Sequence, residues 1–196
     1  MSREKSDPSS IILDAALETI FTDKISGARL RQVARNAGMS QGNLHYYFPT
    51  KDELYRSLLD HLLDIFVDER KTILEDQTIP PRDKLCYFFE QQIQLIQRQK
   101  EVVIFFDFWV QGTADEEIRR KISGMYQKWR QDVKGVIDQG IQEGEFSGIQ
   151  ASLIPALLAS IMDGASLQYR MDETAIDLQD YFNTAYKMIL AMLTLD

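Results

Sequence analysis

The chain has 196 residues, of which 44 % are hydrophobic and 27 % charged, with a formal net charge of −8. This length suits one large domain or two small ones, and the composition is that of a soluble globular protein. The single cysteine, Cys86, excludes an intrachain disulfide, and two histidines are too few for the usual structural zinc patterns. With neither an apolar run of about 18 residues nor a signal-peptide core, the chain is expected to be cytoplasmic, without a membrane span.

The charge is unevenly distributed along the chain. Residues 1–52 contain seven basic and six acidic side chains, whereas the remainder has a net charge of −9. Between Lys24 and Lys51 there are five basic residues and no acidic one, which gives the local positive potential that a phosphate backbone needs. A positively charged, solvated surface explains this charge equally well. The negative total, which argues against a nucleic-acid binder, therefore hides a basic N-terminal segment.

Helical patterns dominate from the N-terminus onward. Asp7 and Pro8 predict the N-cap and first residue of a helix that ends at about Gly27. Two short helices follow, and the segment that joins them, Ala37 to Ser40, has the length of the turn in a DNA-reading helix-turn-helix. We expect these two helices over residues 30–37 and 41–48.

The rest of the chain is also expected to be helical. Thr50 and Glu53 have the spacing of a capping box and predict a long helix that reaches about Leu74. The three glycines between Gly140 and Gly148 predict a loop. Apolar periodicity predicts further helices over residues 82–99, 101–112, 115–141, 150–170 and 174–194. The predicted fold is therefore all-α, with about nine helices.

The third predicted helix has one apolar and one polar face. At about 100° per residue, Leu44 and Phe48 point to one side, and Gly42 and Tyr46 point to the other. Gly42 lets the backbone approach a surface closely, and carboxamides such as that of Asn43 can read adenine edges. Packing of Tyr46 between helices is the alternative interpretation.

Three segments, Ile11–Ala16, Leu30–Ser40 and Gly42–Leu54, together resemble the tetracycline-repressor (TetR) family of transcriptional regulators. The resemblance covers about the first quarter of the chain, and its helix-turn-helix motif is highly specific. It implies a homodimer that reads a palindromic site on double-stranded DNA and a small-molecule effector that controls binding. Residue type and resemblance together give the candidate DNA-binding residues Arg29, Arg31, Ser40, Gln41, Gly42, Asn43, His45, Tyr46, Tyr47 and Lys51.

The resemblance divides these candidates by role. It implies that residues 41–43, 45 and 46 read bases or face the groove, and that Arg29, Tyr47 and Lys51 contact phosphates. Arg29 departs from the family pattern, which often has Thr or Ser there, and can strengthen backbone binding. His45 stands where Tyr is common, so it leaves the operator sequence open. Tyr47 lies near the inward face of its helix and suits packing as well as phosphate contact.

Beyond a DNA-binding domain of residues 1–53, we expect an effector-binding and dimerisation domain over residues 54–196. Its segment 101–110 is apolar nearly all round, which predicts a buried helix. Aromatic and methionine side chains are numerous enough to line a cavity, although a filled core explains any single one of them as well. The candidate ligand-binding residues are Phe66, Phe105, Trp109, Trp129 and Met162.

Two acidic residues, Asp107 and Asp163, lie within apolar runs, where an unpaired charge is costly to bury. A cationic ligand is one possible partner. Helix capping or an internal arginine is the interpretation that we prefer for both residues.

The last two predicted helices each carry two apolar stripes. In residues 150–170, Leu153 and Leu157 belong to one stripe, and Ile154 and Leu158 belong to another. One stripe can pack in the core while the other meets a second copy of the chain. The pattern predicts a homodimer formed through the last two helices.

The leading functional hypothesis is a sequence-specific DNA-binding transcriptional regulator, a repressor that a small-molecule effector releases from a palindromic operator. The alternative is a helix-turn-helix regulator without a small-molecule ligand, which is controlled by a protein partner or acts constitutively. The sequence has no catalytic Ser/His/Asp context, no phosphate-binding glycine loop and no metal-spaced His/Cys set, and His61 is isolated. We therefore expect no enzyme, no metal and no cofactor.

Overall fold

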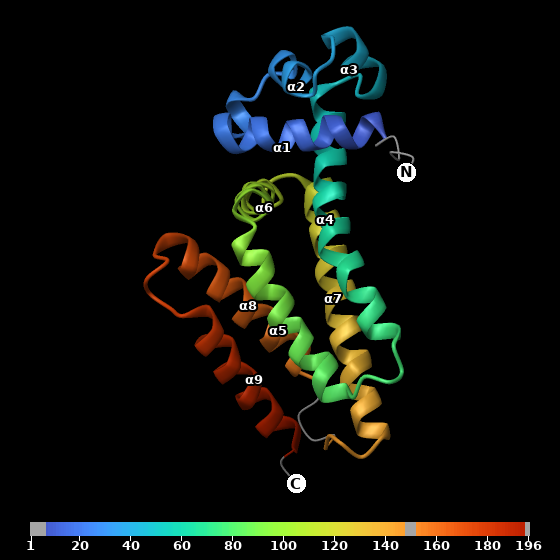
Figure 1. Cartoon of the computed structure of the whole chain (residues 1–196), viewed down its shortest axis with the longest axis vertical. Coiled ribbons are helices and arrows are strands. Elements are labelled where there is room, and N and C mark those ends of the chain that lie inside the picture. Colours follow the sequence, from blue (N-terminus) through green and yellow to red (C-terminus); the bar gives the residue numbers. More distant parts are fainter. Residues whose placement is uncertain (1–6, 148–151, 195–196) are drawn as a thin grey trace, which may run out of the picture. The chain divides into compact units, whose positions relative to one another are not determined.

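The computed structural model describes residues 7–147 and 152–194, without the side chains of residues 25–26 and 66–69. Within these residues every regular element is an α-helix, which confirms the predicted all-α class (Figure 1). The nine helices found there are α1 (Pro8–Gly27), α2 (Leu30–Asn36), α3 (Gln41–Tyr47), α4 (Lys51–Glu75), α5 (Pro81–Gln97), α6 (Gln99–Gln111), α7 (Glu116–Gln142), α8 (Ile154–Met171) and α9 (Leu178–Thr194). None of these helices is long and apolar enough to cross a membrane.

The helices form two compact units. The head unit contains Met1–Phe66 and Arg98–Ile122, and the body unit contains Val67–Gln97 and Ser123–Asp196. Two helices, α4 and α7, run from one unit into the other. The functional division into residues 1–53 and 54–196 stays a prediction, because these units are defined by packing.

In the head unit, α2 and α6 both pack against α1 (Figure 1). The first helix begins as predicted, because the Asp7 carboxylate accepts a hydrogen bond from the Ser9 amide at 3.3 Å. Asn36 at the end of α2 donates to the buried Thr19 hydroxyl of α1 at 2.9 Å. The fully buried side chains of this core include Ile12, Ala16, Leu44, Leu54, Leu58 and Leu62.

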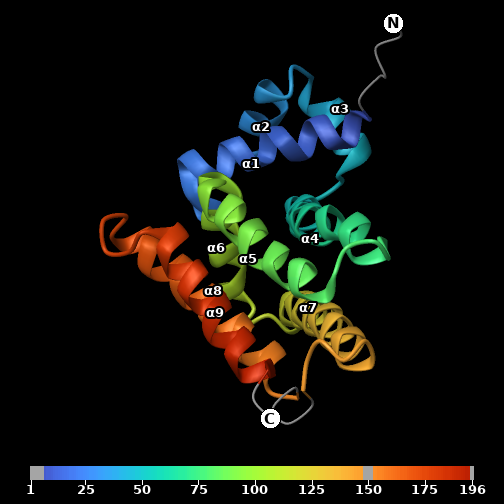
Figure 2. The ribbon, with the colours of Figure 1, turned by 60° about the horizontal axis from the view of Figure 1, so that its bottom comes forward.

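In the body unit, α5 contacts both α8 and α9, and these two helices lie side by side (Figure 2). Aromatic rings join α5 to α9, because Phe89 meets Phe182 at 6.1 Å and Tyr186 at 5.7 Å between ring centroids. The core of this unit is otherwise mostly aliphatic and includes Leu85, Ile96, Val133, Ile137, Leu158, Ile189 and Leu193.

Two buried cations connect the body-unit part of α4 to its neighbours. Arg70 is paired with Asp132 of α7, with 3.1 Å between Nε and Oδ2. Lys84 of α5 is fully buried, and its ammonium donates to the Leu74 carbonyl at 3.0 Å and to the Gln139 amide oxygen at 3.2 Å. Such groups cost desolvation energy, so they are tolerated only where partners are fixed in place.

The late helices begin later than predicted. Helix α9 starts at Leu178, four residues after the expected start at residue 174. The Asp172 carboxylate accepts a hydrogen bond from the Thr174 amide at 2.9 Å and forms a turn. The Asp177 carboxylate accepts a hydrogen bond from the Asp180 amide at 2.9 Å and caps α9. The predicted start of the preceding helix at residue 150 lies outside the described residues, and α8 begins at Ile154.

The predicted loop from Gly140 is wrong at its first residues, because α7 continues to Gln142. The ring of Phe146 folds back onto Gly140, where an added Cβ would lie 2.2 Å from Cδ2 of that ring. The absence of a side chain at Gly140 thus makes room for this ring. The chain leaves the helix at Gly144, whose φ is +74°.

Candidate nucleic-acid interface

The second and third helices form a helix-turn-helix. Val33 and Ala34 of α2 and Leu44 of α3 are buried between the helices. Gly38 adopts a φ of +69°, a left-handed conformation that glycine enters without strain, and so ends α2. The Ser40 hydroxyl accepts a hydrogen bond from the Asn43 amide at 3.1 Å and so caps α3.

The polar face of α3 is exposed. Leu44 is 0 % and Phe48 is 7 % exposed, whereas Tyr46 is 81 % exposed and Gly42 and Asn43 also lie at the surface. The predicted division of this helix into two faces is confirmed, and the alternative in which Tyr46 packs between helices is wrong. Its ring makes an edge-to-face contact with that of Tyr47 on the same helix.

The neighbouring Tyr47 is half-buried. Its ring stands at 88° to that of Tyr46, with 5.2 Å between centroids. Its position agrees with both predicted roles, since part of the ring packs and part stays accessible.

Two further candidates on α3, Gln41 and His45, form a hydrogen bond with each other. The Gln41 amide nitrogen lies 3.3 Å from Nε2 of His45, and Nδ1 of the same ring lies 3.2 Å from the Pro49 carbonyl. A carbonyl can only accept, so Nδ1 carries the hydrogen and Nε2 accepts from Gln41. The amide oxygen of Gln41 is thereby left to interact elsewhere. The i,i+4 spacing of the pair is the sequence signal that could have predicted this contact.

The cationic candidates lie at the starts of α2 and α4. Arg29 and Arg31, at the start of α2, are exposed. The ammonium of Lys51 lies over the Tyr55 ring, 5.1 Å from its centroid, and the Tyr55 hydroxyl donates to the Ala28 carbonyl at 3.4 Å. Burial, with a smaller contribution from Asp52, raises the pKa of Tyr55 to about 12, so this hydroxyl stays a donor. Tyr55 therefore fixes Lys51 near the segment before α2.

Two of the five basic residues between Lys24 and Lys51, namely Lys24 and Arg35, are not among the candidate DNA-binding residues. Arg35 is exposed, and its guanidinium donates to the Gln32 side chain at 2.7 Å. Gln32 donates in turn to Asn36 at 3.2 Å. These i,i+3 and i,i+4 contacts orient Arg35 on α2, and their spacing was the available signal.

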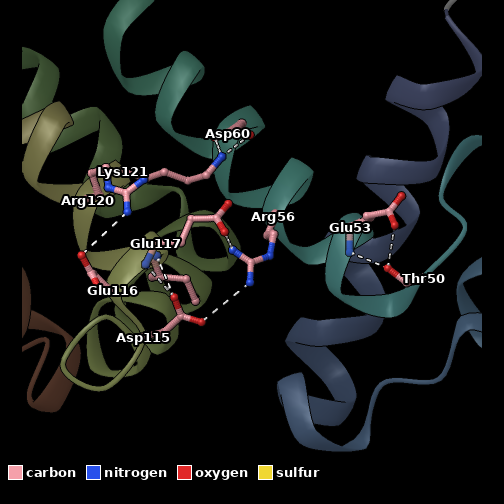
Figure 3. A network of polar contacts seen from close by, with 10 residues as sticks. Thr50, Glu53, Arg56, Asp60, Asp115, Glu116, Glu117, Arg120 and Lys121 are labelled. Carbon is pink, nitrogen blue, oxygen red and sulfur yellow. Dashed lines mark hydrogen bonds and ion pairs between the residues drawn. The ribbon is translucent and has the colours of Figure 1, made fainter.

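A charged network ties the first part of α4 to the start of α7 within the head unit (Figure 3). Arg56 pairs with Glu117 and lies 3.9 Å from Asp115, and Lys121 contacts Asp60 at 2.5 Å. Arg56 and Asp60 are four residues apart on α4, and Glu117 and Lys121 are four residues apart on α7, so the two ion pairs lie one helical turn apart. Exposed pairs contribute only about 0–1 kcal/mol each. The two pairs join α4, which begins at Lys51, to α7 within the head unit.

The candidate ligand-binding residues belong to two different units. Phe105 and Trp109 belong to α6 in the head unit, Trp129 and Met162 belong to the body unit, and the Phe66 side chain lies outside the described residues. Phe105 and Met162 are buried.

The expectation that residues 101–110 are buried all round is wrong. Trp109 is 47 % exposed and Val110 is 63 % exposed. Helix α6 packs on α1 by one side, which leaves these two residues facing outward.

The preferred interpretation of the two acidic residues is also wrong. Asp107 is partly exposed, so its charge remains hydrated. Asp163 accepts a hydrogen bond from the Tyr126 hydroxyl at 2.7 Å, rather than pairing with an arginine or capping a helix. Burial raises the pKa of Asp163, and the hydrogen bond from Tyr126 offsets only part of that effect.

Two family profiles match the chain. The one described as "Bacterial regulatory proteins, tetR family" covers residues 12–58, which include the helix-turn-helix. The one described as "BetI-type transcriptional repressor, C-terminal" covers residues 81–193, more than half of the chain.

Individual relatives agree with these profiles. The fatty acid metabolism regulator protein of Bacillus subtilis is 20 % identical over 181 residues, 92 % of each chain. The HTH-type transcriptional regulator RutR of Escherichia coli is 44 % identical over 75 residues, which are 38 % of this chain and 35 % of RutR.

Solved structures share the whole fold. A TetR transcription regulator from Haloarcula marismortui has a TM-score of 0.86 at 26 % identity and covers 96 % of this chain and 100 % of its own. A transcriptional regulator from Saccharomonospora viridis, in complex with choline, has a TM-score of 0.84 at 20 % identity. The match covers 98 % of this chain and 100 % of that one. The regulator FadR of Bacillus subtilis, in complex with stearoyl-CoA, has a TM-score of 0.74 at 20 % identity. The match covers 93 % of this chain and 97 % of that one.

Proposed function

The chain belongs to the TetR family and is a DNA-binding transcriptional regulator, and we propose that it is a homodimeric repressor released from a palindromic operator by a small-molecule effector. The observation that carries the proposal is the exposed polar face of α3, with Tyr46 81 % exposed beside Asn43. Arg29 and Lys51 supply phosphate contacts around it, which position the protein, and the amides read bases.

The exposed stripes of α8 and α9 support the homodimer. Leu153, just before α8, is 65 % exposed, Leu157 on α8 is 43 % exposed and Met188 on α9 is 62 % exposed, while the opposite stripes are buried. Adjacent exposed apolar side chains mark an interaction surface. A symmetric pair of protomers joined here would present two recognition helices to half-sites about 34–36 Å apart.

A small-molecule effector is supported by two proteins of this fold. The FadR structure contains stearoyl-CoA, and the Saccharomonospora structure contains choline. An effector releases DNA only if it binds the DNA-free conformation more tightly than the DNA-bound one. We place its site among the helices of the body unit.

Two single substitutions test the division between base reading and phosphate contact. Asn43→Ala should change which base is preferred at one position of each half-site, with a discrimination loss of about 1–3 kcal/mol. Lys51→Ala should weaken binding to every sequence by a similar factor and reduce the salt slope by about 1. Fluorescence anisotropy across a library of operator variants at several salt concentrations measures both effects.

Lys134→Ala is the matched control, because this exposed lysine lies on α7 in the body unit and should leave DNA binding unchanged. Identical effects of Asn43→Ala and Lys51→Ala across the library would refute the assigned roles. A wild-type protein without sequence preference at any salt concentration would refute the operator.

A further inference from the structure

Three residues along α3 and its C-terminal end are linked through one imidazole ring. Nδ1 of His45 lies 3.2 Å from the Pro49 carbonyl oxygen, and Nε2 of the same ring lies 3.3 Å from the Gln41 amide nitrogen. Gln41 is exposed at the first position of α3, and His45 is half-buried one turn later. The ring therefore connects a fixed backbone carbonyl to an exposed side chain that is a candidate for base reading.

In the neutral ring, the Pro49 carbonyl decides which nitrogen carries the hydrogen. A carbonyl oxygen only accepts, so Nδ1 donates to it and Nε2 accepts one of the two amide hydrogens of Gln41. The Gln41 carboxamide then keeps its oxygen and its second hydrogen for other partners. One acceptor beside one donor is complementary to adenine, which offers an N6 hydrogen and the N7 acceptor in the major groove.

Protonation of the ring reverses the role of Nε2. Both nitrogens of a histidine cation are donors, so Nδ1 keeps its bond to Pro49 while Nε2 now faces the donor nitrogen of Gln41. Half a turn of the carboxamide about its terminal bond brings the Gln41 oxygen to Nε2 and restores the hydrogen bond. Both amide hydrogens then remain for other partners, and two donors are complementary to the N7 and O6 acceptors of guanine.

The surroundings of His45 leave its charge open to change. Helix α2 packs against α3, and α4 follows it in the chain. The charged side chains at the start of and along α2 and in the first turn of α4 are Arg29, Arg31, Arg35, Lys51, Asp52 and Glu53. Within the described residues no ion pair joins the His45 ring to a carboxylate, whereas the other histidine, His61, lies 3.7 Å from Asp14. Histidine side chains ordinarily change charge between pH 5 and 8, so a change of pH over this range alters the donors of the ring.

We propose that the charge of His45 selects the base that Gln41 reads, adenine when the ring is neutral and guanine when it is protonated. His45 is then a specificity-determining residue that acts through Gln41, and the sequence preference of the protein depends on pH. This inference rests on the proposed reading of an operator by α3, and it adds a proton to that reading.

The experiment compares base preferences of the full chain at pH 8 and pH 5.5. The probes are duplexes that the protein selects from random DNA, varied at each base pair and measured by fluorescence anisotropy. The position read by Gln41 is the one at which Gln41→Ala loses its preference. At this position the ratio of adenine to guanine affinity should fall on the order of 10-fold from pH 8 to pH 5.5, the effect of one good base contact. A general gain of affinity for phosphates at low pH cancels in this ratio.

Two histidine variants locate the effect. His45→Phe keeps an aromatic ring but has no ring nitrogen, so its adenine-to-guanine ratio should be the same at both pH values. His61→Asn is the matched control, because it removes the other histidine of the chain and should keep the full pH dependence. Circular dichroism at both pH values checks that each variant stays folded.

A spectroscopic measurement on the protein without DNA tests the hydrogen-bond pattern itself. Nitrogen-15 NMR of the His61→Asn protein observes the His45 ring alone. At pH 8, Nδ1 should carry the hydrogen and Nε2 should have none, as the contact with Pro49 requires. At pH 5.5 both nitrogens should carry a hydrogen.

Four results would each overturn the inference. They are an unchanged adenine-to-guanine ratio in the wild-type protein, a pH-dependent ratio in His45→Phe, loss of the pH dependence in His61→Asn, and a hydrogen on Nε2 at pH 8. The proposed function fails separately. A protein without base preference at any position has no operator, whereas a pH-independent ratio beside clear preferences at other positions refutes only the role of His45.

Discussion

Asp132→Leu should lower the free energy of unfolding by about 3–5 kcal/mol, the cost of removing one partner of a buried ion pair. The side chains of Arg70 and Asp132 are 2 % and 8 % exposed, and Nε lies 3.1 Å from the carboxylate. Burial lowers the pKa of Arg70, and the Asp132 contact offsets only part of that effect. Leucine would leave the guanidinium buried without this carboxylate. Urea denaturation followed by circular dichroism measures the loss.

The double variant Arg70→Met/Asp132→Leu should regain most of the stability that Asp132→Leu loses. An apolar pair of similar volume removes both buried charges together with their desolvation cost. Asp138→Leu is the control on the same helix. Its pair with Lys134 is exposed, at 46 % and 61 %, so its loss should change stability little. A double variant as unstable as Asp132→Leu would contradict this account of the pair.

Leu157→Glu should abolish dimerisation and weaken operator binding by at least about 100-fold, the effect of disrupting a central interface residue. Leu157 is 43 % exposed, so the glutamate remains hydrated in a single protomer and the fold is retained. In the proposed dimer it would be buried without a cation. Each separated protomer would present one recognition helix and lose the second half-site. Sedimentation velocity and anisotropy on the same samples measure both losses.

Val110→Glu is the matched control, because it places the same charge at an exposed apolar residue of α6 in the head unit. It should leave dimerisation and operator binding unchanged. A Leu157→Glu variant that remains dimeric would exclude this stripe of α8 from the interface.

The elements that could be predicted from the sequence are those set by local signals. The cap at Asp7, the left-handed Gly38 and the cap at Ser40 each act within a few residues, and all three are in the structure. The outward face of α3 follows from helical periodicity alone, since the burial of Leu44 and the exposure of Tyr46 match the wheel.

What could not be predicted depends on contacts between distant residues. Gly140 lies within α7 with the ring of Phe146 packed on it, and no local propensity indicates that contact. Asp163 meets Tyr126, 37 residues earlier in the chain, so its partner could not be read from spacing. Apolar composition suggested a buried helix over residues 101–110, but packing on one side left Trp109 half-exposed. Composition gives the amount of apolar surface, and tertiary packing decides which part of it is covered.

Selection of binding sites from random duplex DNA with the full-length protein tests the central claim most directly. The account predicts one enriched palindrome, bound by two protomers, with half-sites centred about one helical turn apart and an affinity that falls steeply as salt rises. No enriched sequence, or a single asymmetric site bound by one protomer, would contradict it.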